Sequence, residues 1–177
     1  KERGGVARAL NLAVEIASGE LIARMDGDDV CLPGRIRAQV DTFLQNPSLG
    51  VVGASVEVFD ETQSGKVIRF PGGHYEIWWH MVFYCTLAHP TVMMKRSVPV
   101  GMPYPEDDEH SSIEDYVLWL RLLFGHDGTK FANMPGIYVR HRKHRKGHDA
   151  SKKAEKQRKQ DVEACCRALS YAMGSSV

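Results

Sequence analysis

The sequence has little of what would assign it to a membrane, disulfide-stabilised or strongly charged class of protein. No apolar run of about eighteen residues occurs in the chain, so no membrane-spanning helix is predicted. The four cysteines form no CxxC pair and no dense framework, which argues against a disulfide scaffold and favours a reducing, cytoplasmic compartment. The formal net charge is only +1, so overall charge indicates no partner, and the positive excess lies mostly in residues 139–159.

Short helix-like and strand-like segments alternate along the 177 residues, which indicates an α/β fold with a mixed sheet. The composition, 43% hydrophobic and 25% charged, is that of one ordinary domain with a core of its own. Apolar spacing predicts helices in 6–17, from Ile36 to Leu44, in 74–86 and in 113–125. It predicts strands in 20–25 (buried), 51–59, 67–70, 90–95, 129–133 and 136–141.

The expected organisation is one α/β unit over residues 1–150, followed by a C-terminal helix within 151–177. This helix carries an apolar side with Val162 and Met173, and basic residues in its first turns. Such a helix can pack on the domain, on a second copy of the chain or on a membrane surface. Peripheral membrane association and a homo-oligomer therefore both stay open.

Three carboxylates, Asp26, Asp28 and Asp29, fall within four positions directly after the predicted strand 20–25. Like charges this close repel, and burying them without partners is expensive. At the carboxyl end of a strand, two such groups spaced i, i+2 can meet at a hard divalent cation, which commonly bridges to phosphates. The alternative is a solvated turn, because Asp and Gly are turn formers.

A second acidic pair, Glu114 and Asp115, begins the predicted helix 113–125. A helix N-terminus stabilises carboxylates, so capping is the ordinary explanation. One member of the pair could instead act as a general base aimed into a cleft.

The segment 138–151 (YVRHRKHRKGHDAS) concentrates arginine, lysine and histidine. Arg and Lys suit phosphate oxygens, and His suits phosphate or metal. A solvated basic loop is one alternative, and a nucleic-acid patch is another, although interleaved aromatics are absent. A zinc site built from His141, His144 and His148 with Cys165 or Cys166 matches no standard spacing.

Taken in order, these segments resemble the family 2 glycosyltransferases, which have the GT-A fold. The resemblance rests on the ordered set GELIARMDGDDVCLPGRI, NPSLGVVGA, HPTVMMKR, EDYVLWLRL and RKHRKGHDAS, and it extends from about Gly4 to Ser151. It implies a GT-A-like, mainly parallel mixed sheet flanked by helices. It also implies the inverting transfer of a sugar from a nucleotide-diphosphate donor, a UDP-sugar in first place, to a hydroxyl of a glycan, lipid or protein.

The resemblance further implies roles for the acidic residues. Its Asp-x-Asp motif matches Asp26 and Asp28, with Asp26 near the donor's ribose or sugar and Asp28 on a Mn²⁺ or Mg²⁺ ion at the diphosphate. Asp29 becomes a neighbouring support. In the Glu114–Asp115 pair, Asp115 is the base that deprotonates the acceptor hydroxyl.

The family's later Arg-x-His motif matches Arg142 and His144. His144 would reach the metal or the diphosphate, and Arg142 the phosphates. Arg140 and His141 offer a shifted register for the same motif. A metal with basic side chains stabilises the charge that develops on a leaving diphosphate, which would explain the crowded aspartates.

The family begins with a strand and a βα unit that bind the nucleotide base, and these have no counterpart ahead of the matched motifs. We therefore expect the chain to be the C-terminal portion of a longer catalytic domain. The alternative function is a non-catalytic, truncated relative that binds a nucleotide, a glycan or a protein partner. A nucleic-acid partner, bound through 138–159, is not expected.

Overall fold

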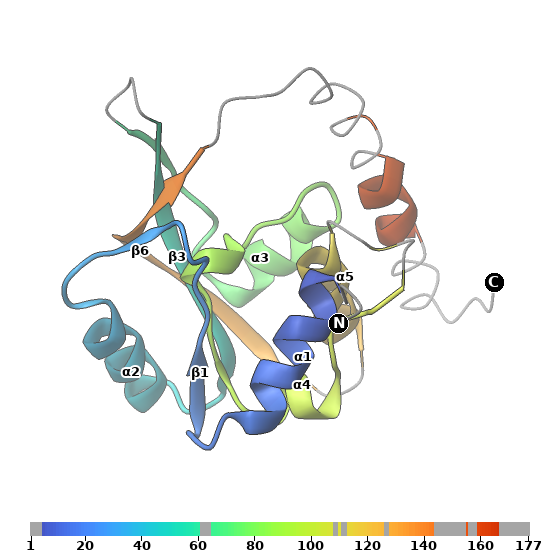
Figure 1. Cartoon of the computed structure of the whole chain (residues 1–177), viewed down its shortest axis with the longest axis horizontal. Coiled ribbons are helices and arrows are strands. Elements are labelled where there is room, and N and C mark those ends of the chain that lie inside the picture. Colours follow the sequence, from blue (N-terminus) through green and yellow to red (C-terminus); the bar gives the residue numbers. More distant parts are fainter. Residues whose placement is uncertain are drawn as a thin grey trace.

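The computed structural model describes residues 5–60, 65–107, 110, 113–125, 128–143, 155 and 159–166. Helices lie on both faces of a central sheet (Figure 1). The elements are α1 (Val6–Ile16), β1 (Leu21–Ala23), β2 (Val30–Cys31), α2 (Arg35–Gln45), β3 (Leu49–Phe59), β4 (Lys66–Ile68), α3 (His74–Met81), the 3₁₀ helix η1 (His89–Thr91), β5 (Met93–Lys95), α4 (Ser97–Gly101), α5 (Glu114–Phe124) and β6 (Lys130–Arg142).

The sheet is mixed, as predicted, and runs in the order β1-β5-β3-β6-β2, with β4 also paired to β3. The long ladder between β3 and β6 is parallel. The other four ladders among the described strands are antiparallel and shorter, so parallel and antiparallel pairing both contribute to the mixed sheet. β4 follows β3 after a few residues, and a connection that short permits only an antiparallel neighbour.

Alternate residues of β3 enter two hydrophobic cores, one on each face of the sheet. Val51 belongs to the larger cluster, which also holds the fully buried Trp119 of α5. Val52 belongs to the smaller cluster, together with Phe43 of α2. Both faces of β3 are therefore covered, and this strand forms the centre of the fold.

The predicted helices are present, but α2 buries a different side from the one expected. Its buried residues include Arg35 and Gln39, whereas the apolar Ile36 is half exposed. Arg35 Nη2 donates to the backbone carbonyl of Arg24 at 2.7 Å, and Gln39 Nε2 donates to that of Val52 at 3.1 Å. Buried polar groups need such partners, and the bond from Arg35 attaches α2 to the backbone that leads into the aspartate-rich turn.

Two strands differ from the sequence-based expectation. β1 is a half-buried edge strand rather than a buried one. β6 is one strand over 130–142 where two had been predicted. Its pairing with β3 shifts register near Ala54, and these irregularities accommodate Pro135 and Gly136 inside one continuous strand.

The described part of the C-terminal helix, residues 159–166, lies against the larger core. Its buried side includes Ala164, whereas Val162 of the predicted apolar side is exposed, and Met173 lies outside the described residues. Among the helices that the structure describes, none has the length and apolarity needed to cross a membrane.

Candidate active site

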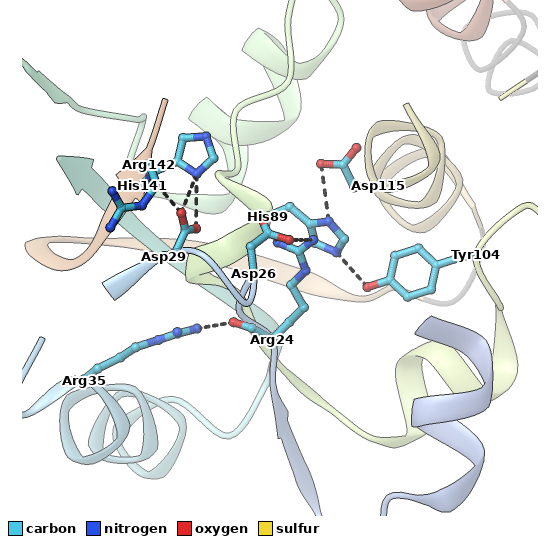
Figure 2. Close-up of polar contacts among 9 residues, drawn as sticks. All are labelled: Arg24, Asp26, Asp29, Arg35, His89, Tyr104, Asp115, His141 and Arg142. Atoms are coloured by element: carbon cyan, nitrogen blue, oxygen red, sulfur yellow. Dashed lines mark hydrogen bonds and ion pairs between the residues drawn. The ribbon is translucent and has the colours of Figure 1, made fainter. Parts of the chain in front are cut away.

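The aspartate turn, defined as residues 26–29, meets the end of β6 because of the register of β2. Val30 pairs with Arg140 in this antiparallel ladder, so the residues next along the chain, Asp29 and His141, fall side by side. Nδ1 of His141 lies 3.0 Å from Oδ1 of Asp29 (Figure 2). The Asp29 side chain is 0% exposed, so this carboxylate depends on its protein partners.

Arg142 joins the same turn from β6. Its backbone N–H donates to Oδ1 of Asp29 at 2.8 Å, and its Nε donates to the backbone carbonyl of Asp28 at 3.1 Å. The guanidinium groups of Arg142 and Arg140 lie over the ring of Phe59, at 4.8 and 4.5 Å from its centroid. Arg140 also pairs with Glu57 at 2.9 Å, so its charge is already partly compensated.

The guanidinium group of Arg24 balances the negative charge of Asp26, the first aspartate of the turn. Its Nη1 and Nη2 donate to the two oxygens of Asp26 at 2.9 and 2.6 Å, the paired geometry that makes Arg–carboxylate contacts strong. The bond from Arg35 to the Arg24 backbone holds this segment in place. Asp26 remains 35% exposed at its side chain, so part of the carboxylate still faces solvent.

These residues include a group able to hold a metal. Ligand atoms of Asp26, Asp29 and His141 all lie within 4.8 Å of one another. Because Asp29 is enclosed and already bonded to His141 Nδ1, we assign it to orienting the imidazole, as a carboxylate commonly does behind a metal-binding histidine. Among the described residues, no hydrogen bond reaches the other ring nitrogen, Nε2. The group offers carboxylate oxygens and an imidazole nitrogen, which are ligands that Mn²⁺ or Mg²⁺ accepts, and Asp28 is exposed on the same turn but is not one of its three members.

The two registers of the Arg-x-His motif name different histidines, and the structure describes only one of them. His144 lies outside the described residues. The shifted register, Arg140 with His141, brings His141 to the turn. The zinc alternative also depends on His144 and His148, both outside the described residues.

The second acidic pair begins α5, and Asp115 faces η1. Its Oδ2 lies 3.8 Å from Nδ1 of His89, and Nε2 of His89 lies 3.0 Å from the hydroxyl of Tyr104 (Figure 2). These three residues are called the Asp115 pocket below. In this view His89 lies between the aspartate turn and Asp115.

The electrostatics of the Asp115 pocket favour uncharged forms. Burial raises the pKa of Asp115 to about 6, with the neighbouring charge of Glu114 acting in the same direction and Arg24 acting against it. Burial also lowers the pKa of His89 well below its usual value, helped by Arg24. His89 is therefore neutral at pH 7 and does not form an ion pair with Asp115. A pKa near neutrality is expected of a carboxyl group that acts as a general base.

A cavity of about 310 Å³ is lined by residues of the Asp115 pocket and by His141, the partner of Asp29. Its wall includes Asp115, His89 and Tyr116 on one side and His141 of β6 on the other, and Asp161 of the C-terminal helix also lines it. The space is therefore bordered both by the metal-capable group and by the carboxyl of raised pKa.

Several residues of this site were not singled out by sequence reasoning. Sequence reasoning assigned no role to Arg24, His89, Tyr104 or Asp161. The available signal was the position of Arg24 two residues before Asp26, and of His89 in a His-Pro pair before β5. Neither spacing alone predicts that these groups surround Asp115.

Known proteins with similar sequences are glycosyltransferases. A family model described as glycosyl transferase family 2 matches residues 1–94. The O-antigen biosynthesis glycosyltransferase WbnJ of Escherichia coli is 35% identical over 146 residues, covering 82% of this chain and 56% of that protein. The amylovoran biosynthesis glycosyltransferase AmsE of Erwinia amylovora is 31% identical over 137 residues, covering 77% of this chain and 50% of that protein. The chain thus spans about half the length of these two curated relatives.

Solved structures show the same fold. Staphylococcus aureus TarS 1–349 in complex with UDP-GlcNAc superposes with a TM-score of 0.60 at 15% identity, over 90% of this chain and 47% of that chain. Glucosyl-3-phosphoglycerate synthase from Mycobacterium tuberculosis, in complex with Mn²⁺, UDP-glucose and phosphoglyceric acid, gives 0.60 at 14% identity, over 98% and 56%. At these identities the likeness establishes the GT-A fold alone.

Proposed function

The chain belongs to glycosyl transferase family 2, and from this membership we propose that it is the catalytic part of a metal-dependent, inverting glycosyltransferase. The favoured donor is a nucleotide-diphosphate sugar, with a UDP-sugar in first place, and the acceptor is a hydroxyl group. The observation that supports this most is the single cavity lined by both Asp115 and His141. Two structural neighbours were crystallised with UDP-sugars, one of them with Mn²⁺, which supports the choice of donor and metal.

The aspartate turn is the proposed metal site. Asp26, from the metal-capable group, and Asp28, from the Asp-x-Asp motif, would supply carboxylate oxygens, and His141 would supply Nε2, while Asp29 holds the imidazole through Nδ1. When bound, a divalent ion neutralises charge on the leaving diphosphate. Among the chain's own residues, Arg24 already limits the repulsion between the turn's carboxylates by pairing with Asp26.

The arginines at the end of β6 are the proposed phosphate ligands. Arg142 is anchored to the turn by its Nε, and the ring of Phe59 supports its guanidinium plane. Arg140 is the weaker candidate because Glu57 shares its charge. Arg and phosphate oxygens match in geometry and charge, so Arg142 would orient the diphosphate toward the turn.

Asp115 is the proposed general base. With a pKa of about 6 it is mostly ionised at pH 7, yet it accepts a proton more readily than an ordinary aspartate. Glu114 assists by raising the pKa of its neighbour. The neutral His89, held by Tyr104, keeps a charged partner away from the carboxylate, so the base stays free to take the proton of an acceptor hydroxyl.

The test is a nucleotide panel on the complete natural protein. Melting temperatures are measured with UDP, GDP, CDP and TDP, each with and without Mn²⁺, because a ligand that binds only the native state raises the melting temperature. We expect a shift with one nucleotide that requires Mn²⁺ and disappears in Asp28→Ala. The control Asp41→Ala, on α2 and outside the site, should keep the shift.

Two results would contradict the proposed function. One is the absence of a shift with every nucleotide. The other is a nucleotide shift that neither Mn²⁺ nor Asp28→Ala changes, because the turn would then take no part in binding the diphosphate.

A further inference from the structure

A second carboxylate enters the cavity from the C-terminal helix. Asp161 lines the same space as Asp115, Tyr116 and Cys85. Two contacts fix the helix that carries it: Ala164 is buried in the larger core, and Cys165 Sγ donates to the backbone carbonyl of Val82 at 2.6 Å. Figure 1 shows this helical segment, coloured red, on the side of the molecule where α5 lies. Asp161 is therefore part of the cavity wall.

The charge of Asp161 acts on residues that also line the cavity. Burial raises the pKa of the Cys85 thiol, and the charges of both Asp115 and Asp161 add to that effect. The charge of Asp161 also contributes to the raised pKa of Tyr116, after burial and two thiols. Asp115 and Asp161 therefore both act on Cys85, and both line the cavity that Cys85 lines.

Among the described residues, none offers the carboxylate of Asp161 a hydrogen-bond or ion-pair partner. Asp161 is half-buried, and burial raises its pKa. An ionised carboxylate only accepts hydrogen bonds, and sugar hydroxyls and amines supply donors, whereas phosphates and carboxylates would be repelled.

We propose that Asp161 is a specificity-determining residue that binds a neutral or amine-bearing sugar of the acceptor and rejects an anionic one; this rests on the proposed function. The general base must lie beside the acceptor hydroxyl, so we assign a second carboxylate that lines the same cavity to the acceptor side. The cavity, about 310 Å³, lies at the small end of the range for ligand pockets, which suits one sugar ring. The carboxylate oxygens of Asp161 would both accept hydrogen bonds from a neutral or amine-bearing sugar and repel an anionic one.

The test measures acceptor binding and donor binding in one sample of the complete natural protein. Four p-nitrophenyl β-glycosides serve as probes: the glucoside, the galactoside, the N-acetylglucosaminide and the glucuronide. Each is titrated in the presence of UDP and Mn²⁺ and followed by saturation-transfer NMR. We expect at least one neutral probe to bind, and Asp161→Asn to weaken it about tenfold, because it loses a hydrogen bond to a charged group. The glucuronide should gain affinity relative to that probe.

The control is Glu163→Gln, the same kind of change at an exposed position of the same helix, which should leave every affinity unchanged. Asp161→Asn should not lower the melting temperature, because folding disfavours the charge that it removes. A second variant, Asp161→Glu, keeps the charge and should keep the preference for neutral probes.

The outcomes separate the two proposals. UDP binding with Mn²⁺, combined with equal glycoside affinities in the wild type and Asp161→Asn, would overturn the role of Asp161 alone. The same holds if no neutral probe binds the wild type. Failure of UDP to bind at all would overturn the proposed function itself.

Discussion

The aspartate turn and the Asp115 pocket both hold carboxylates, but the surroundings of these carboxylates are opposite. In the turn, Arg24 donates two hydrogen bonds to Asp26, and Asp29 accepts hydrogen bonds from β6. In the pocket, Asp115 faces a neutral His89, and its pKa rises to about 6. The same kind of side chain is therefore paired with basic groups and backbone donors in one region, and has a pKa near neutrality in the other.

The difference also affects stability. A compensated carboxylate such as Asp29 supports the fold that encloses it, whereas a desolvated one such as Asp115 works against it. Functional sites commonly keep such unfavourable groups because the chemistry needs them. Matched Asp-to-Asn substitutions in the two regions should therefore change the free energy of unfolding in opposite directions.

The largest expected effect is on transfer in Asp115→Asn. Removing a general base costs about 10²–10⁴-fold in rate, while binding of UDP with Mn²⁺ should be unchanged. Initial rates with the active donor, alongside UDP titrations, measure both. Asp41→Asn on α2 is the matched control and should keep the full rate. A rate within a few-fold of wild type would remove Asp115 from the role of base.

The next effect is on metal affinity in Asp29→Asn. This change loosens the imidazole of His141, and loss of such a supporting carboxylate commonly weakens metal binding by about 10–100-fold. Mn²⁺ titration in the presence of UDP measures it. The same titration of Asp115→Asn should match wild type, and equal losses in the two variants would end the distinction between the regions.

The sign of the stability change is a third test. The pKa of Asp115 is raised on folding, so its contribution to stability is full below about pH 4 and is lost as the pH rises through about 6. At pH 7, Asp115→Asn should then gain about 2 kcal/mol, or about 5 °C in melting temperature. Near pH 4 the gain should vanish. Calorimetry at both values measures this.

In the same scans, Asp29→Asn should lose stability at pH 7, by about 1–3 kcal/mol, because it disrupts enclosed hydrogen bonds. Changes of the same sign in Asp29→Asn and Asp115→Asn at pH 7 would contradict the contrast between the two regions.

The smallest effect is on the pH profile. The acid limb of kcat/KM should fall at about pH 6, the pKa of Asp115 in the free enzyme. Glu114→Gln removes a charge that raises this pKa, so the limb should move to lower pH by less than about one unit. A limb that stays in place, or moves upward, would show that Glu114 does not act on the base.

Much of the fold and the positions of the acidic residues could be predicted from the sequence. Hydrophobic periodicity located α1 and α5, and β3 was evident from its β-branched alternation. The ordered motifs led to the family, and with it to Asp26, Asp28 and Asp115. These features are local in sequence, so short-range spacing carries them.

The contacts within the site could not be predicted, because they depend on register and on distant segments. Asp29 meets His141 only because β2 pairs with β6 at Val30 and Arg140, and a shift of one residue would turn the side chains to the other face. His89 reaches Asp115 through the fold rather than through spacing. Local periodicity also gave no warning that α2 would bury Arg35 to satisfy backbone carbonyls.

The most direct test of the account is whether His141 coordinates the metal at the aspartate turn. Pulsed EPR on the complete natural protein with Mn²⁺ and UDP detects imidazole nitrogen bound to manganese. We predict a nitrogen coupling in the wild type that is lost in His141→Gln and retained in His89→Gln. A coupling that survives in His141→Gln, or no coupling in the wild type, would contradict the account.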